Sequence, residues 1–215
     1  MKKIAIIGAG GFGREVKMLI DQINAVNLQY ECIGFFDDKP YDRPINGLPY
    51  LGTVADAANL ANPMSFALGI GDPAIRRKIV RALDRPGIGF PNLVHPSVIM
   101  GGDEVSMGRG NIICAGNILT VNIEVKDFVI LNLCCTVGHD TVIGSYSSFM
   151  PSVNISGEVV IHDGVYVGTG AKIINQLEIG AHTVVGAGAV VAKSLPPNCT
   201  AVGIPAKPIK FHDNQ

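Results

Sequence analysis

Tryptophan is absent from the 215-residue sequence and aromatic residues make up only 6% of it, so the core must be built mainly from aliphatic side chains. Charged residues are few, at 16%, and 17 Lys and Arg nearly balance 18 Asp and Glu. A chain without a basic excess lacks the charge that binds nucleic acid, so no nucleic-acid partner is expected. A hydrophobic content of 47% with a net charge of only −1 excludes a disordered chain.

Long apolar runs are also missing. The longest, around residues 128–137, is interrupted by Asn132 and falls short of the ~18–20 residues that span a bilayer. The run Ile4–Ile7 is too short for a secretory signal and leads into a glycine loop. The five cysteines form no C-x-x-C pattern and the five histidines are scattered, so no metal site is expected. These patterns predict a cytoplasmic protein with free thiols and no membrane insertion.

The first part of the chain, residues 1–93, alternates strand and helix signals. Lys2–Ile7 and Tyr30–Phe36 are apolar runs typical of buried strands, and Arg14–Ile23 carries apolar residues at helical spacing. Ser65–Ile70 is a third expected strand, followed by Asp72, which is well placed to cap a helix that begins at a proline. This alternation predicts a small Rossmann-like α/β domain with a parallel sheet.

The second part, residues 94–215, follows a six-residue period. Every sixth residue from Met107 to Val191 is apolar, fifteen in succession, for which chance gives a probability on the order of 10⁻⁵. A glycine often comes directly after, and we expect it to support a corner. Such a period is typical of a parallel β-helix in which each hexapeptide makes one short strand.

The expected β-helix is a triangular prism. Three hexapeptides close one coil, so residues 18 apart stack about 4.8 Å from each other, and residues 107–193 provide about five coils. The prism buries its inside and leaves flat outer faces, which favours association. We expect a homotrimer, and a monomer in light scattering would contradict this.

A glycine loop follows the first expected strand. Gly8, Gly10 and Gly13 match the pattern G-x-G-x-x-G, and Asp37 lies 24 residues beyond Gly13 at the end of the next strand. This spacing is that of a dinucleotide fingerprint. The domain is only long enough for one mononucleotide-binding half, however, so the pattern alone leaves the ligand open.

Three motifs together resemble a known family. They are Gly8-x-Gly10-Gly11-x-Gly13-Arg14-Glu15-Val16, Gly138-His139-Asp140-x-x-Ile143-Gly144 and Val202-Gly203-Ile204-Pro205-Ala206-Lys207. Nearly the whole chain resembles the bacterial hexapeptide-repeat sugar acetyltransferases of the sialic-acid O-acetyltransferase type. That group includes N-acetyltransferases of nucleotide-linked 4-amino-4,6-dideoxy sugars. The resemblance implies a left-handed β-helix and acetyl-CoA as the co-substrate.

His139 is the expected catalytic base. It is the second residue after the inward-pointing Val137 and follows Gly138, so it should face outward from a corner. Asp140 comes next and is placed to orient the imidazole. A neutral imidazole suits proton removal near working pH, and we expect direct transfer without an acylated cysteine. The resemblance supports both residues as catalytic.

Acetyl-CoA is expected along the later, glycine-rich coils. Gly157 lies 18 residues after His139, where its bare backbone and N–H would meet the thioester. Relatives often carry a second histidine nine residues after the catalytic one, and here Ser148 takes that place. The other expected acetyl-CoA contacts are Gly168, Gly170, Ala171, Gly186, Ala187, Gly203, Ile204, Pro205 and Lys207, the last near phosphates.

The resemblance assigns a nucleotide-sugar site to the N-terminal domain. The expected substrate contacts are Gly10, Gly11, Phe12, Asp37, Asp38, Lys39 and Gly71, with Asn132 in the β-helix as a further sugar contact.

The function that follows is acetyl-CoA-dependent acetylation of the 4-amino group of a nucleotide-linked amino-dideoxy sugar, with active sites between the subunits of a trimer. Two alternatives stay open. One is O-acetylation of sialic acid or another sugar, and the other is a non-catalytic, nucleotide-binding trimer. The nucleotide base and the sugar stereochemistry are open as well.

Overall fold

The computed structural model describes residues 1–213. The chain divides into two compact units, Met1–Pro96 and a second unit that begins at Ser97. The division at Pro96 lies slightly beyond residue 93, where the sequence pattern changes. Within residues 1–213, no helix is both long and apolar enough to cross a membrane.

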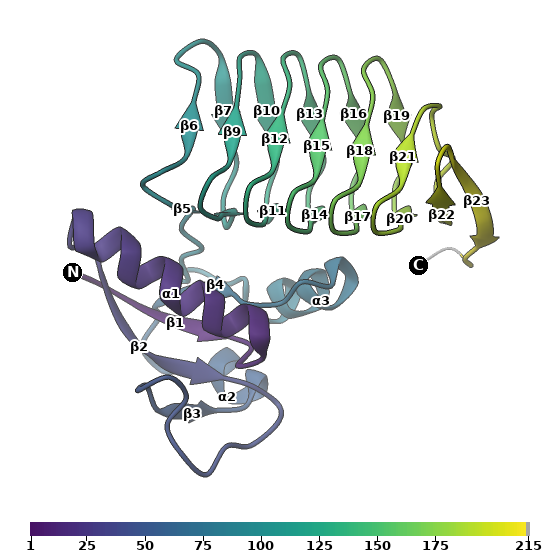
Figure 1. The fold of residues 1–215 in the computed structure, drawn as a ribbon. Coiled ribbons are helices and arrows are strands. Elements are labelled where there is room, and N and C mark those ends of the chain that lie inside the picture. Colours follow the sequence, from purple (N-terminus) through teal and green to yellow (C-terminus); the bar gives the residue numbers. More distant parts are fainter. Residues whose placement is uncertain (214–215) are drawn as a thin grey trace. The chain divides into compact units, whose positions relative to one another are not determined.

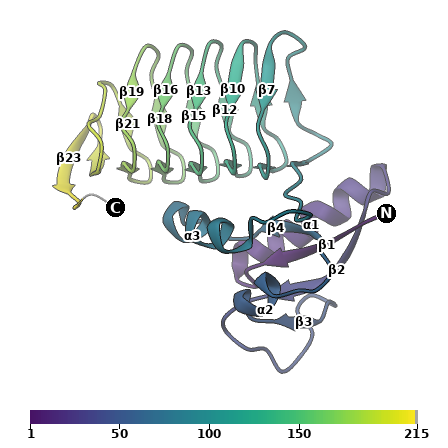
Figure 2. The same cartoon turned by 180° about the vertical axis from the view of Figure 1, so that it is seen from behind.

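The first unit is a four-stranded parallel sheet with helices on both faces. The strand order is β3-β2-β1-β4 and every pairing is parallel. Figures 1 and 2 show α1 over one face and α2 over the other. The elements of this unit are β1 (Lys2–Ile7), α1 (Gly11–Val26), β2 (Tyr30–Phe36), β3 (Tyr50–Gly52), α2 (Val54–Ala58), β4 (Ser65–Leu68), α3 (Pro73–Leu83) and β5 (Leu93–Val94).

Local sequence signals explain the helices of this unit. The apolar stripe of α1, including Val16, Leu19 and Ile20, is buried against the sheet. The helix begins at Gly11, earlier than the expected Arg14, because part of the glycine loop forms its first turn. Asp72 caps α3 by accepting a hydrogen bond of 2.9 Å from the Ile75 amide, as the sequence predicted. The strand β3 was not predicted, because three residues carry too little pattern.

Glycines allow α1 to approach the sheet closely. A Cβ at Gly13 would lie 1.8 Å from the carbonyl oxygen of Gly8, and one at Gly69 would lie 2.5 Å from the Cα of Gly13. Gly8 itself has a φ of +95°, which a side chain would oppose. These three glycines therefore join the ends of β1 and β4 to the start of α1.

The second unit is a parallel β-helix whose coils stack one upon another (Figure 1). Its strands lie in three sheets, which we name after one member each. The β12 face has the order β21-β18-β15-β12-β9-β6, and the β13 face has the order β19-β16-β13-β10-β7. The β14 face contains β22-β20-β17-β14-β11-β8.

The bounds of these strands follow the hexapeptide period. They are β6 (Ile99–Met100), β7 (Val105–Met107), β8 (Ile112–Ile113), β9 (Ile118–Leu119), β10 (Ile123–Val125), β11 (Ile130–Leu131), β12 (Thr136–Val137), β13 (Val142–Ile143), β14 (Ser148–Phe149), β15 (Asn154–Ile155), β16 (Val160–Ile161), β17 (Tyr166–Val167), β18 (Lys172–Ile173), β19 (Glu178–Ile179), β20 (Val184–Val185), β21 (Val190–Val191), β22 (Cys199–Gly203) and β23 (Ala206–Phe211).

The register confirms the predicted prism. Val125 pairs with Ile143 and Leu131 with Phe149, so residues 18 apart lie side by side on successive coils. The β13 face contains five strands, in agreement with about five coils. The apolar residues of the six-residue series point inward, and all of them from Ile113 to Val191 are buried.

The corners have a six-residue period of their own. Every sixth residue from Glu104 to Gly188 has a positive φ, fifteen positions in all, and ten of these are not glycine. The glycines that directly follow the inward residues do not supply these turns, which corrects the sequence-based interpretation. A Cβ at Gly138 would lie 2.5 Å from the Gly157 nitrogen, and one at Gly168 would lie 2.5 Å from the Ala187 nitrogen. These glycines are required because the next coil passes so close.

The β-helix ends in a hairpin that the sequence did not predict. Val184 pairs with Thr200, so the last coil is shorter than the 18-residue repeat. β22 then pairs antiparallel with β23, and the cis peptide Ile204-Pro205 lies in the turn between them. Cys199 to Phe211 therefore extend the β14 face by two strands.

We expect Gly13→Ala to destabilise the first unit. The new methyl group overlaps the Gly8 carbonyl, and such overpacking costs about 1–3 kcal/mol of unfolding free energy. Gly11→Ala is the matched control, because no atom lies within 4 Å of its Cβ position and alanine is the better helix former. Urea unfolding of the full chain measures both. Equal stability of the two variants would contradict the close-packing role of Gly13.

Candidate active site

His139 and Asp140 form a pair at the corner between β12 and β13. Nδ1 of His139 lies 2.7 Å from Oδ2 of Asp140, and roughly half of each side chain is exposed. The left-handed conformation of Asp140, with φ of +57°, turns the chain between the two strands. Both side chains therefore face outward from the prism, as the sequence predicted.

Asp140 is held by the preceding coil as well. Nδ2 of Asn122 donates a hydrogen bond of 2.9 Å to Oδ1 of Asp140. The hydrogen bonds from Asn122 and from His139 hold the pKa of the Asp140 carboxyl below its ordinary value of 3.8. An ionised carboxylate can only accept, so the Nδ1 of His139 carries the proton and its Nε2 is the basic nitrogen.

Gly157 lies under the imidazole on the following coil. A Cβ at Gly157 would be 2.5 Å from Nε2 of His139 and 2.6 Å from Cε1. The Glu158 amide donates a hydrogen bond of 2.7 Å to the His139 carbonyl, which fixes the two coils to each other. Gly157 is buried, so its missing side chain makes room for the ring. Direct contact of this glycine with a thioester stays a prediction.

A polar column runs along the outside of the β12 face beside this corner. Asn154 donates a hydrogen bond of 2.8 Å to Oγ1 of Thr136. Lys172 donates to Oδ1 of Asn154 and, at 3.1 Å, to the carbonyl of Ser152. The column places the exposed ammonium of Lys172 two coils above Thr136, a position that no sequence pattern indicated.

The expected glycines of the later coils lie at the opposite edge of the β12 face. Gly168, Gly170 and Ala171 form the corner between β17 and β18, and Gly186 and Ala187 form the same corner one coil later. No atom lies within 4 Å of a Cβ placed at Gly170, so its backbone is open. The β12 face therefore connects this glycine-rich corner with the corner of His139.

Two expected contacts are placed away from the imidazole in a single chain. Ser148 belongs to β14 and is fully buried. Asn132 lies at the corner between β11 and β12 and is 6% exposed. Its Oδ1 accepts a hydrogen bond of 2.7 Å from the Leu133 amide, and its carbonyl accepts one of 2.9 Å from Asn117. Asn132 therefore stabilises its corner, and Ser148 lies on a different face of the prism from His139.

The late motif forms the terminal hairpin. Gly203, with φ of +99°, precedes the cis bond between Ile204 and Pro205, and Lys207 lies in β23. All four residues are exposed, Ile204 by 76%.

In the first unit, a pocket of about 590 Å³ opens at the start of α1. It lies at the carboxyl ends of β1 and β2, the edge at which open α/β sheets bind ligands. Three cationic side chains surround it, and only Lys39 among them was predicted as a contact. The lining residues are Ala9, Gly10, Arg14, Lys39, Tyr41, Arg43, Pro44, Ile45 and Asn46.

The two expected acidic contacts instead hold loops. Asp37 accepts hydrogen bonds of 2.7 Å from the Ala9 amide and 2.8 Å from the Lys39 amide. Asp38 accepts one of 3.1 Å from the Val54 amide. Asp37 therefore ties the glycine loop to the loop that carries Lys39.

The remaining expected contacts lie at the same edge of the sheet. Gly11 and Phe12 are in the first turn of α1, and Gly71 follows β4 and accepts a hydrogen bond of 3.2 Å from Arg76. No atom lies within 4 Å of a Cβ at Gly10, Gly11 or Gly71.

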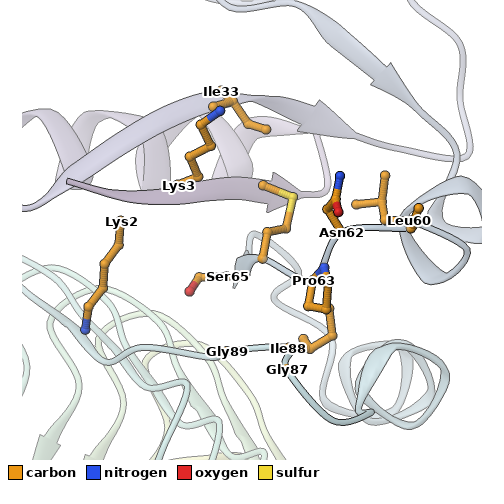
Figure 3. Close-up of a pocket in the computed structure, with 12 residues that line it drawn as sticks. Lys2, Lys3, Ile33, Leu60, Asn62, Pro63, Ser65, Gly87, Ile88 and Gly89 are labelled. Atoms are coloured by element: carbon orange, nitrogen blue, oxygen red, sulfur yellow. The ribbon is translucent and has the colours of Figure 1, made fainter.

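A larger pocket, of about 810 Å³, lies at the amino ends of the strands (Figure 3). Figure 3 shows Lys2 and Lys3 extending to opposite sides of β1, as neighbours in a strand do, with Pro63 and Ile88 on the loops nearby. This is the edge away from the glycine loop, so the smaller cationic pocket is the better ligand site in this unit.

Metal sites and reactive cysteines are the other groups that could support catalysis in residues 1–213. Within residues 1–213, no group of three or more His, Cys, Asp or Glu side chains is arranged to hold a metal ion. Burial raises the pKa of the thiols of Cys32 and Cys135 to about 11, which keeps them protonated and poor as nucleophiles.

Comparison with known proteins identifies both units. Residues 3–83 match the family model of the PglD N-terminal domain, and residues 158–193 match the bacterial transferase hexapeptide model with six repeats. The chain is 31% identical over 221 residues to GDP-perosamine N-acetyltransferase of Escherichia coli O157:H7, covering 98% of this chain and 97% of the relative. The chain belongs to this family of sugar acetyltransferases.

Solved structures agree with this assignment. The acetyltransferase superimposes with a TM-score of 0.83 and 28% identity on PerB from Caulobacter crescentus, solved with CoA and GDP-perosamine, over 98% of both chains. It superimposes with a TM-score of 0.86 and 30% identity on the acetyltransferase domain of PglB from Neisseria gonorrhoeae FA1090, solved with acetyl coenzyme A, over 97% of this chain and 99% of that one. The fold is therefore the left-handed hexapeptide β-helix joined to a Rossmann-like domain.

We expect Gly157→Ala to displace the imidazole of His139, because the added methyl group would overlap the ring. A displacement of about 1 Å lowers the rate of acetyl transfer roughly a hundredfold. The measurement is the initial rate of CoA release. Gly102→Ala is the control, since no atom lies within 4 Å of its Cβ position. An unchanged rate in the Gly157 variant would show that the ring position is not set by this glycine.

Proposed function

We propose that the protein transfers the acetyl group of acetyl-CoA to the 4-amino group of a nucleotide-linked amino-dideoxy sugar, with His139 as general base. The observation that carries the proposal is the His139–Asp140 pair, which leaves Nε2 as the basic nitrogen on the outside of an acetyltransferase β-helix. The full-length similarity to a GDP-perosamine N-acetyltransferase supports the acceptor class.

The proposed reaction is a direct transfer. Nε2 of His139 takes a proton from the acceptor amine as the amine nitrogen attacks the thioester carbonyl carbon. The C–S bond then breaks, the amide forms, and the proton passes to the CoA sulfur. Asp140 holds the proton on Nδ1 and stabilises the imidazolium that forms. The high pKa of the Cys135 thiol, about 11, disfavours an acyl-enzyme there.

The donor site in this proposal is the β12 face. The open backbone at Gly170 accommodates the pantetheine arm, and Lys172 supplies a cation for a phosphate. Gly168, Ala171, Gly186 and Ala187 continue the same corner, and the hairpin residues Gly203, Ile204, Pro205 and Lys207 lie at the adenine end in this proposal. A hydrogen bond from the Gly157 amide to the thioester carbonyl belongs to the proposal as well.

The acceptor site in this proposal is the cationic pocket of the first unit. The amides in the first turn of α1, which include those of Gly11 and Phe12, have no acceptor within the helix, and Arg14, Lys39 and Arg43 line the pocket at the start of this helix. A sugar-linked diphosphate carries the negative charge that such a pocket favours. Asp37 positions both loops of the pocket, and in this proposal Asp38 and Gly71 border the acceptor without recognising its charge.

A homotrimer is part of the proposal. Apolar side chains are exposed on the outer faces of the prism, among them Ile99 by 63%, Ile118 by 38% and Val160 by 40%. Association of three prisms would bury them. It would also be needed to bring Ser148 of one copy near His139 of another, since a single chain places them on different faces. The mass in solution, measured by light scattering, distinguishes three copies from one.

Replacing His139 tests the proposed base. We expect His139→Asn to lower kcat by roughly 10²–10⁴-fold, because the proton acceptor is lost. His162→Asn is the matched control, since that imidazole also contacts a carboxylate, Glu178 at 2.5 Å, but at another corner. The rate of CoA release with saturating substrates measures both. Retained activity in the His139 variant would remove this residue from the mechanism.

Replacing Arg43 tests the acceptor site. We expect Arg43→Ala to raise KM for a nucleotide-linked amino sugar about tenfold or more, because a charge-assisted contact is lost. The KM for the same amino sugar without its nucleotide should be unchanged.

A panel of acceptors that includes sialic acid separates N-acetylation from O-acetylation, since CoA release with sialic acid and not with amines would select O-acetylation. If Arg43→Ala raised KM equally for the amino sugar with and without its nucleotide, the nucleotide would bind outside this pocket.

A further inference from the structure

A column of polar side chains follows the corner of His139 through four coils. Asn122, Asp140, Glu158 and Gln176 are 18 residues apart in turn, and each has a positive φ between +54° and +60°. Backbone hydrogen bonds link successive rungs, from Asp140 to the Val121 carbonyl, from Glu158 to His139 and from Gln176 to Gly157. The order along the column is amide, acid, acid, amide.

The amides bind the acids pairwise. Asn122 donates to Asp140 at 2.9 Å, and Nε2 of Gln176 donates to Oε2 of Glu158 at 3.1 Å. The two acids occupy neighbouring rungs about 4.8 Å apart, where like charges repel. Each acid is therefore held by the amide on its far side, and only Asp140 contacts the imidazole, at 2.7 Å.

We propose that Asn122 is a positioning residue for acetyl transfer. By binding Oδ1 of Asp140, Asn122 holds Oδ2 of the same carboxylate where it fixes the proton on Nδ1 of His139. This inference rests on the proposed role of His139. Asn122 acts through Asp140 and needs no contact with a substrate. Gln176 makes the same bond to Glu158, but within residues 1–213 the hydrogen bond of the imidazole goes to Asp140 and not to Glu158, so we assign Gln176 no role in catalysis.

Further acidic side chains lie near this column. A groove of about 450 Å³ beside Asp140 is lined by Glu104, Ser106 and Glu124 among others. Lys126 is paired with Glu124. Glu104 occupies the rung before Asn122. Glu104 and Glu158 therefore lie on the two sides of the pair formed by Asn122 and Asp140. The amide at position 122 separates the carboxylate of Asp140 from that of Glu104.

The test compares Asn122→Asp with Gln176→Glu. Both changes are isosteric and replace an amide donor by a carboxylate facing a carboxylate. Of the two positions, only residue 122 contacts Asp140. Aspartate tolerates the left-handed backbone nearly as well as asparagine, so the fold should persist. We expect Asn122→Asp to lower kcat about tenfold to a hundredfold near neutral pH, with KM values within about twofold of the wild type. Gln176→Glu should leave kcat within about twofold.

The pH profile separates positioning from a structural effect. Protonation of the carboxyl introduced at position 122 restores an O–H donor to Asp140. The ratio of kcat for Asn122→Asp to kcat for the wild type should therefore rise as the pH falls from about 8 to about 5.5. A ratio that is independent of pH, an unchanged kcat, or an equal loss in Gln176→Glu would each overturn the inference.

Histidine ¹⁵N NMR gives a measurement that is independent of activity. The His139 signal, assigned by its loss in His139→Asn, should show the Nδ1-protonated tautomer in the wild type and a mixture of tautomers in Asn122→Asp. An unaltered tautomer in the variant would overturn the inference. If His139→Asn keeps full activity, the proposed function fails. If His139→Asn is inactive and Asn122→Asp is fully active, only the role of Asn122 fails.

Discussion

The stacking of coils at an 18-residue interval is the constraint on which the β-helix depends. Backbone hydrogen bonds join each coil to the next, and an aliphatic side chain from every hexapeptide fills the interior. Because the strands from β6 to β21 are only two or three residues long, none is stable alone and each coil depends on its neighbours. The same interval places His139 over Gly157 and Asn122 beside Asp140. The stacking of coils therefore brings the residues of the candidate active site together.

The corners of the β-helix are where polar side chains of the candidate active site are exposed, although the interior is filled with aliphatic side chains. A left-handed residue turns the chain once in every six, and the residue directly before it can also be exposed. At one corner these two residues are His139 and Asp140, and the neighbouring coils provide a glycine on one side and an amide on the other. A side chain on a strand has its direction fixed by the pleat, whereas the corner lets two adjacent side chains meet.

In the first unit, close packing and the proposed acceptor pocket share one glycine loop. Gly8 and Gly13 are required where α1 meets the sheet, and Gly10 has no atom near its Cβ position and lines the cationic pocket. The spacing of these glycines therefore matches a dinucleotide fingerprint, although the sheet has only four strands. The pocket is distinguished by two arginines: Arg14, which belongs to the glycine motif, and Arg43, which comes from the loop after β2 and belongs to no motif.

The sequence by itself determined the two-part architecture, the inward aliphatic series, the outward position of His139 and the family, because each of these depends on a local pattern or a short repeat. The tertiary structure alone decided the contacts between coils and loops. It showed that Gly157 makes room for the imidazole, that Asp37 and Asp38 hold loops, and that Asn122 and Lys172 lie near the site. These contacts join residues 16 or more positions apart, and their geometry depends on rotamers and hydrogen bonds that no periodicity encodes.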